Sequence, residues 1–118
     1  MLLTNFLKDA LNKYFEVVIG DWYEKLKIIG KQSMDRQKLD FKNSLNLKGH
    51  YYSVDGTLYN ANEFGNFLWG YVMASKYSYD FVKISSELGT FYKEYRFDEN
   101  NEQRAIYNGY FKYWTRNK

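Results

Sequence analysis

Apolar residues near the start of the chain recur at the spacing of one helix face. Thr4 can cap this first helix, which we expect to run to about Val18 and to end at Gly20. Its apolar face is predicted to carry Phe6, Leu7, Ala10, Leu11, Tyr14 and Phe15. Asp21 can then cap a second helix, which Gly30 is expected to end.

The helical spacing is lost between Gln32 and Asn60, where Ser, Asn, Gly and Asp interrupt the apolar residues. We expect an irregular stretch here, with one short β-hairpin over residues 51–59. Its turn is predicted at Asp55-Gly56, because glycine accepts the positive φ that tight hairpin turns require. A long loop in a small domain is more often functional than idle.

Three more helices are predicted in the second half of the chain, at about residues 60–76, 78–96 and 101–114. Asn60 or Asn62 can cap the first of them. The second, capped by Ser78 or Asp80, is expected to bury Phe81, Ile84, Leu88, Phe91 and Tyr95. The chain contains no proline, which agrees with a helical fold. The sequence thus predicts a single, mainly α domain over residues 1–118, with about five helices, an irregular central loop and one small β-hairpin.

Composition limits the chemistry that this chain can carry. It has 118 residues, no cysteine and one histidine, which excludes disulfides, thiol nucleophiles and the usual zinc sites from the candidates. Hard cations held by carboxylates stay open, but no metal and no cofactor is predicted. A formal charge of +3 and 21% aromatic residues permit a polyanionic partner without demanding one.

The sequence contains no candidate membrane segment. No stretch approaches the roughly 18 apolar residues that a transmembrane helix needs. The apolar residues of positions 1–19 are interrupted by polar side chains at Lys8, Asp9, Asn12, Lys13 and Glu16. We therefore predict neither a membrane span nor a signal peptide here.

Several short motifs carry a family resemblance. Residues 64–71 read F-G-N-F-L-W-G-Y, residues 98–103 read D-E-N-N-E-Q, and a segment from Ile106 to Trp114 follows. Upstream, a Trp-containing segment over residues 22–30 precedes Asp35. Together these motifs resemble the polymorphic-toxin type 44 domain, a C-terminal toxin of secreted bacterial competition proteins, over about residues 22–114.

The sequence departs from the family pattern in two respects. Its second and third acids are Glu99 and Glu102 in this sequence, and the Lys usually found two residues after the Asp falls on Gln37, with Lys38 one place later. The resemblance implies a toxin that is secreted or delivered into target bacteria on a larger parent protein. It also implies ribonuclease activity in the competitor's cytoplasm and a cognate immunity protein in the producer.

The candidate catalytic residues are Asp35, Asp98, Glu102 and His50. The resemblance reaches the three acids, which can act as an acid and base pair if distant segments bring them together. Asp98 and Glu102 can equally stabilise the N-terminus of the last helix through its dipole. His50 can take the proton of a ribose 2′-hydroxyl, although a structural histidine is the alternative and the family's motifs include no His there.

The candidate substrate-binding residues are Asn66, Lys38, Trp69 and Arg104. Asn66 lies between Gly65 and Gly70, so it either offers its amide to a ligand or belongs to a close helix crossing. Lys and Arg alternate with Tyr and Phe along much of the chain, a pattern that suits single-stranded RNA but is also typical of a solvated helix face.

Three function classes therefore remain open. The first is the ribonuclease. The second is a periplasmic hydrolase of cell-wall glycan, with peptidoglycan as its substrate and two carboxylates flanking the glycosidic bond. The third is a non-catalytic helical module whose aromatic surface binds another protein.

Overall fold

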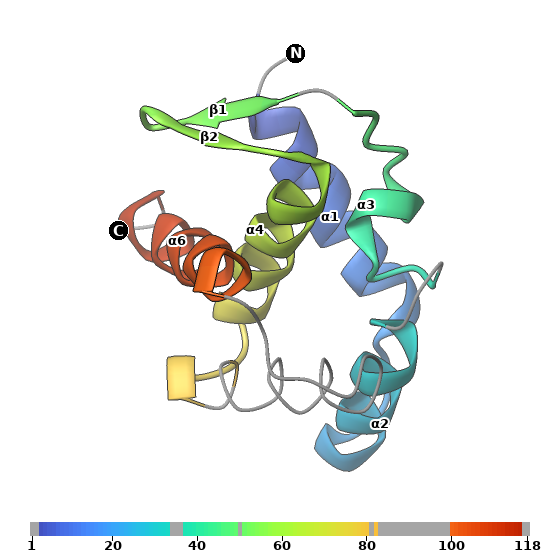
Figure 1. The fold of residues 1–118 in the computed structure, drawn as a ribbon. Helices are drawn as coiled ribbons and strands as arrows, with labels where there is room; N and C mark the ends of the chain where they lie inside the picture. Colours follow the sequence, from blue (N-terminus) through green and yellow to red (C-terminus); the bar gives the residue numbers. More distant parts are fainter. Residues whose placement is uncertain (1–2, 34–36, 50, 81, 83–99, 117–118) are drawn as a thin grey trace.

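The computed structural model describes residues 3–33, 37–49, 51–80, 82 and 100–116. Its elements are α1 (Leu3–Val17), α2 (Trp22–Gln32), α3 (Phe41–Ser44), β1 (Tyr52–Val54), β2 (Thr57–Tyr59), α4 (Ala61–Ala74) and α6 (Asn100–Arg116), as labelled in Figure 1. The two strands form one antiparallel sheet. The predicted fold class, mainly α with one small hairpin, is confirmed.

The starts of α2 and α4 follow the predicted caps. Asp21 accepts a hydrogen bond from the backbone N–H of Glu24 at 2.9 Å. Asn60 and Glu63 form a reciprocal capping box, in which each side chain accepts from the other residue's backbone N–H at 2.8 Å. These bonds satisfy donors that a helix leaves unpaired at its first turn, so each helix begins where its capping residue stands.

The predicted ends of the first two helices are partly right. Gly20 has a φ of 101°, which stops the chain from continuing as a helix after α1. Thr4 is not the N-cap of α1, because the helix already includes Leu3. Gly30 does not end α2, which continues to Gln32 with Ser33 as its C-cap.

The hairpin forms about the predicted turn. Its register pairs Ser53 with Leu58, and both turn residues have positive φ, 51° at Asp55 and 83° at Gly56. Two consecutive left-handed residues are the hallmark of a turn whose twist matches that of paired strands. The hairpin therefore projects a carboxylate, that of Asp55, from its tip.

The short helix α3 lies in the stretch between Gln32 and Asn60 that was predicted to be irregular apart from the hairpin. Phe41 at its start is buried, and the backbone of Lys42 packs closely on Gly65 of α4, where a Cβ would lie 3.1 Å from the Lys42 nitrogen. A single helical turn is not stable by itself, so contacts with α4 hold it in place.

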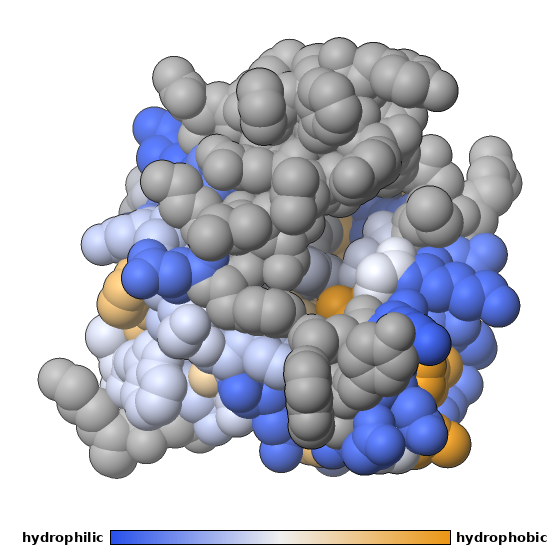
Figure 2. Space-filling model, turned by 90° about the horizontal axis from the view of Figure 1, so that it is seen from below, coloured by the Kyte–Doolittle hydropathy of each residue, from blue (hydrophilic) through white to orange (hydrophobic). Residues whose placement is uncertain are grey.

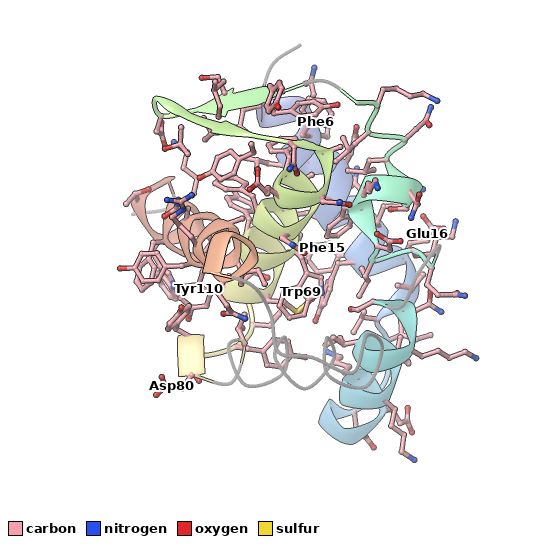
Figure 3. All side chains as sticks on the ribbon, viewed as in Figure 1. Phe6, Phe15, Glu16, Trp69, Asp80 and Tyr110 are labelled. Carbon is pink, nitrogen blue, oxygen red and sulfur yellow. The ribbon has the colours of Figure 1, made fainter. Side chains whose placement is uncertain are left out.

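Helix α4 occupies the centre of the fold, with α6 on one side and α1 and α3 on the other (Figure 1). Ten of its fourteen residues are buried, which explains why its sequence is apolar on nearly all faces. The hairpin is joined to this core by three aromatic rings. Tyr52 stacks on Phe64 with ring centres 4.6 Å apart, and Phe6 of α1 meets both rings edge-on beneath the hairpin (Figure 3).

Two predictions about the core have different outcomes. Phe15 was expected to face inward, but 56% of its surface is exposed, because the buried stripe of α1 runs through Leu7, Ala10 and Tyr14 instead. The predicted helix over residues 78–96 begins as expected, since Val82 donates to the Ser78 carbonyl at 3.1 Å. The rest of that helix lies outside the described residues.

Candidate functional site on α6 and the hairpin

The predicted catalytic residues fall largely outside the part of the chain that the structure describes. Asp35, Asp98 and His50 are in segments that are not described. Glu102 lies in the first turn of α6. That these four residues come together in one site therefore stays a prediction.

Two predicted substrate-binding residues, Trp69 and Lys38, make contacts within the described fold. The indole N–H of Trp69 donates to the Ser33 hydroxyl at 3.0 Å and so ties α4 to the end of α2 (Figure 3). The Lys38 ammonium lies 3.2 Å from the Glu16 carboxylate on α1, with about half of each side chain exposed. Both side chains thus already have partners within the fold.

Asn66 is half-buried on α4, and its neighbouring glycines have a packing role. A Cβ added to Gly70 would overlap the carbonyl oxygen of Ile106 in α6. Gly109 of α6 lies in the same way against the carbonyl oxygen of Phe67. The predicted close helix crossing is therefore present, although backbone rather than a ring approaches the glycine.

An exposed row of aromatic residues follows one side of α6. It consists of Tyr107, Phe111 and Trp114, which we call the aromatic row, and their exposed fractions are 47%, 39% and 49%. The spacing of four and three residues places the three rings on one helix face. Arg104 is exposed one turn before Tyr107 and adds a positive charge to the start of this face.

Ring contacts fix the first part of the aromatic row. The centres of Tyr107 and Phe111 are 4.6 Å apart. Tyr79 packs against both rings, at 5.4 Å and 5.7 Å, and also against Tyr110. The Tyr110 hydroxyl in turn donates to the Tyr77 carbonyl at 2.7 Å. The residues that pack against Tyr107 and Phe111 are thus themselves held by further contacts. Rings held in this way lose little further freedom when a planar ligand stacks on them.

A groove of about 310 Å³ lies beside the row, between the hairpin and α6. Its described lining consists of Val54, Asp55, Thr57, Tyr59, Phe67, Asn108, Phe111, Lys112 and Thr115. Phe111 belongs to both the aromatic row and the groove, so the two form one continuous surface.

Two polar contacts cross this groove and join the hairpin to α6. The Lys112 ammonium lies 3.1 Å and 3.3 Å from the two carboxylate oxygens of Asp55. The side-chain amide of Asn108 donates to the Tyr59 hydroxyl at 2.8 Å. The groove therefore contains a cation, a carboxylate, an amide and a phenol beside the exposed ring of Phe111.

The sequence indicates parts of this surface but not its continuity from the aromatic row to the groove. The sequence predicts the Asp55-Gly56 turn and a role for Arg104 as separate features. The spacing of residues 107, 111 and 114 was the available signal for the row. Because 21% of the chain is aromatic, that signal did not separate exposed rings from core rings.

Among the residues that the structure describes, Tyr14 has a strongly shifted pKa, and it lies in the core. Burial of Tyr14 in α1 raises the pKa of its phenol well above the usual value, because the phenolate would lose its hydration, and the neighbouring Tyr77 adds to this effect. Among the described residues, we find no group of three or more His, Cys, Asp or Glu side chains that could hold a metal ion.

The hydropathy of the described surface can be followed in the view from below (Figure 2). Figure 2 shows a mainly hydrophilic described surface on this side, with hydrophobic residues in small separate patches. None of the helices in the described part of the chain is long and apolar enough to span a bilayer.

Comparison with protein-family models, curated proteins and solved structures finds no match to this chain. The resemblance to the type 44 toxins therefore rests on its short motifs alone.

Proposed function

We propose that this domain is an antibacterial toxin that acts on RNA, and that single-stranded RNA lies along the aromatic row of α6. The observation that carries the proposal is the exposure of Tyr107, Phe111 and Trp114 in one line along α6, with Arg104 exposed one turn before them. Proteins that bind single strands use such rings as stacking platforms for successive bases, and each stacked base contributes about 1–3 kcal/mol.

The charges on the same helix support this assignment. Arg104 precedes the row and Lys112 stands beside Phe111, so cations flank the rings as a phosphate backbone requires. Part of the Lys112 charge is offset by Asp55, which agrees with weak, sequence-tolerant binding rather than tight binding.

Cleavage of the bound RNA is the enzymatic part of the proposal. The motif resemblance supports Asp35, Asp98 and Glu102 as acids and bases, with His50 as the alternative base. The same resemblance supports delivery on a larger parent protein and a cognate immunity protein. An immunity protein that covers the α6 face would be expected to carry acidic residues opposite Arg104.

The glycan hydrolase is less well supported by this surface. Exposed rings also stack on sugars, but hydrolysis needs two carboxyl groups across the scissile bond. Among the described residues that line the groove, Asp55 is the only carboxylate, and it is paired with Lys112.

A growth experiment tests the proposal. The domain is expressed without a neutralising partner in a susceptible bacterium, once in the cytoplasm and once in the periplasm through an added signal peptide. Arrest from the cytoplasm with degraded RNA is the expected result. Lysis only from the periplasm would favour the glycan hydrolase, and no effect from either compartment would favour the interaction module.

A matched pair of variants links the result to the row. Phe111→Ala should relieve the arrest, because it removes the ring at the centre of the proposed RNA path. Phe15→Ala removes a ring on α1 that is more exposed than Phe111, 56% against 39%, and should leave the arrest unchanged. Equal effects of both variants would count against the α6 face.

A further inference from the structure

The groove between the hairpin and α6 offers more than a stacking surface. We propose that it binds one nucleotide of the RNA, with the base against Phe111 and the phosphate on Lys112. This inference rests on the proposed function and names the part of the substrate that the groove holds. Phe111 connects the groove to the proposed RNA path, because it belongs both to the aromatic row and to the lining of the groove.

The size of the groove suits a single nucleotide. Small-molecule sites generally have volumes of about 300–1,000 Å³, and this groove, at about 310 Å³, is at the lower end. Phe111, which is 39% exposed, supplies an aromatic face at the groove, while Tyr59 and Phe67 contribute to the lining from largely buried positions. A planar base can therefore stack on Phe111 at the groove while the neighbouring bases continue along the aromatic row.

A pair of hydrogen-bonding groups fits the edge of a base. Because the Tyr59 oxygen accepts from the Asn108 amide, the Tyr59 hydroxyl hydrogen remains able to donate. The carbonyl oxygen of Asn108 in turn remains able to accept. One donor and one acceptor side by side match the adjacent acceptor and donor on the Watson–Crick edge of an unpaired base.

The ion pair across the groove is arranged so that a phosphate can replace Asp55. The Asp55 side chain is 68% exposed at the hairpin tip, whereas the Lys112 side chain is only 22% exposed. An ion pair with so exposed a partner contributes little to stability, so it is easily exchanged. A phosphate group offers several charged acceptors to the same ammonium and takes the place of the carboxylate.

This exchange predicts effects of opposite sign for two variants that break the same ion pair. Lys112→Met removes the phosphate contact and should weaken nucleotide binding by about tenfold. Asp55→Asn removes the competing carboxylate and its negative charge, so it should tighten binding by about threefold. If the pair only held the hairpin against α6, both variants would change binding in the same direction.

The experiment titrates the wild-type domain and both variants with uridine 5′-monophosphate, uridine, inorganic phosphate and a single-stranded oligouridylate, followed by NMR of the side-chain amides. We expect the monophosphate to bind more tightly than uridine or phosphate alone and to shift the Asn108 amide signal. Urea unfolding of each variant confirms that it is folded. Asn108→Ala serves as a second groove variant and should weaken binding without altering any charge.

The outcomes separate this inference from the proposed function. If the oligouridylate binds through the row, but the monophosphate does not bind or the two charge variants agree in sign, the groove assignment is overturned and the RNA surface stands. If neither ligand binds the wild-type domain, the proposed function fails and the inference fails with it.

Discussion

Gly109 of α6 lies so close to the carbonyl oxygen of Phe67 in α4 that any side chain at position 109 would overlap it. The relationship is reciprocal, since Gly70 of α4 stands against the carbonyl oxygen of Ile106 in α6. The two helices therefore cross at backbone contact. This crossing sets where the aromatic row lies relative to the hairpin, and so determines the shape of the groove.

Replacing Gly109 should consequently loosen the whole site. Gly109→Ala is expected to lower the free energy of unfolding by about 1–3 kcal/mol, since the added methyl group forces the helices apart. Gly30→Ala is the matched control, because Gly30 lies within α2 with open space around it. That change should raise stability by about 0.5–1 kcal/mol through helix propensity. Urea unfolding curves measure both, and a neutral Gly109→Ala would contradict the close crossing.

The bond between Trp69 and Ser33 predicts that Trp69 acts in folding rather than in substrate binding. Ser33→Ala should lower the free energy of unfolding by about 1 kcal/mol, because the half-buried indole N–H loses its acceptor. Trp69→Phe should cost more, and the double variant should show that the two effects are not additive. RNA binding should be unchanged by Ser33→Ala in folded protein; a loss of binding would return Trp69 to the candidate ligand contacts.

The buried phenol of Tyr14 predicts a decline of stability at alkaline pH. In the folded protein the pKa of Tyr14 is raised, whereas a tyrosine in the unfolded chain ionises near pH 10. Above that pH the unfolded state binds fewer protons, so the free energy of unfolding falls by up to about 1.4 kcal/mol for each pH unit. Below pH 9 this contribution is constant.

Tyr14→Phe tests the assignment, because it keeps the ring and removes the ionisable group. Unfolding curves recorded from pH 8 to pH 11 should show a smaller decline for the variant than for the wild-type domain. Tyr51→Phe, at a tyrosine that is 74% exposed, should not change the decline. Equal slopes for wild type and Tyr14→Phe would show that the buried phenol is not the cause.

The catalytic prediction is tested by substitution at the motif positions. Asp35→Ala and Asp98→Ala should each abolish RNA cleavage while leaving RNA binding within about twofold, since stacking on α6 does not depend on them. His50→Ala separates a carboxylate base from a histidine base. Full activity of this variant would assign the base to the acidic residues, and loss of activity would assign it to His50. Retention of full toxicity by both acid variants and by Asn66→Ala would show that the motif-based site is wrong.

Much of the fold follows from local chemistry that a sequence displays. The caps at Asp21 and Asn60 and the turn at Asp55-Gly56 all depend on residues within a few positions of one another. Helix α3 could not be predicted in this way, because its single turn is stabilised by α4, far along the chain. The prediction that Phe15 belongs to the buried face was wrong for a related reason. Apolar spacing within α1 does not show which part of that helix is covered by other helices.

The candidate site is harder to predict than the fold. Its groove is built from the hairpin tip and the last helix, and the contact between Asp55 and Lys112 spans 57 positions. Exposure of the aromatic row is likewise a tertiary property, because rings at the same helical spacing fill the core elsewhere in the chain. The reciprocal glycines 70 and 109 were visible in the sequence, but not as partners in one crossing.

The most direct test of the account measures binding of a fluorescently labelled single-stranded RNA to the domain by anisotropy, at low and at physiological salt. The wild-type domain should bind, more weakly at higher salt, and Tyr107→Ala and Trp114→Ala should each reduce affinity by about tenfold or more. Phe15→Ala should bind as the wild type does. Absence of RNA binding by the folded wild-type domain, or equal loss in all three variants, would contradict the assignment of α6 as an RNA-binding surface.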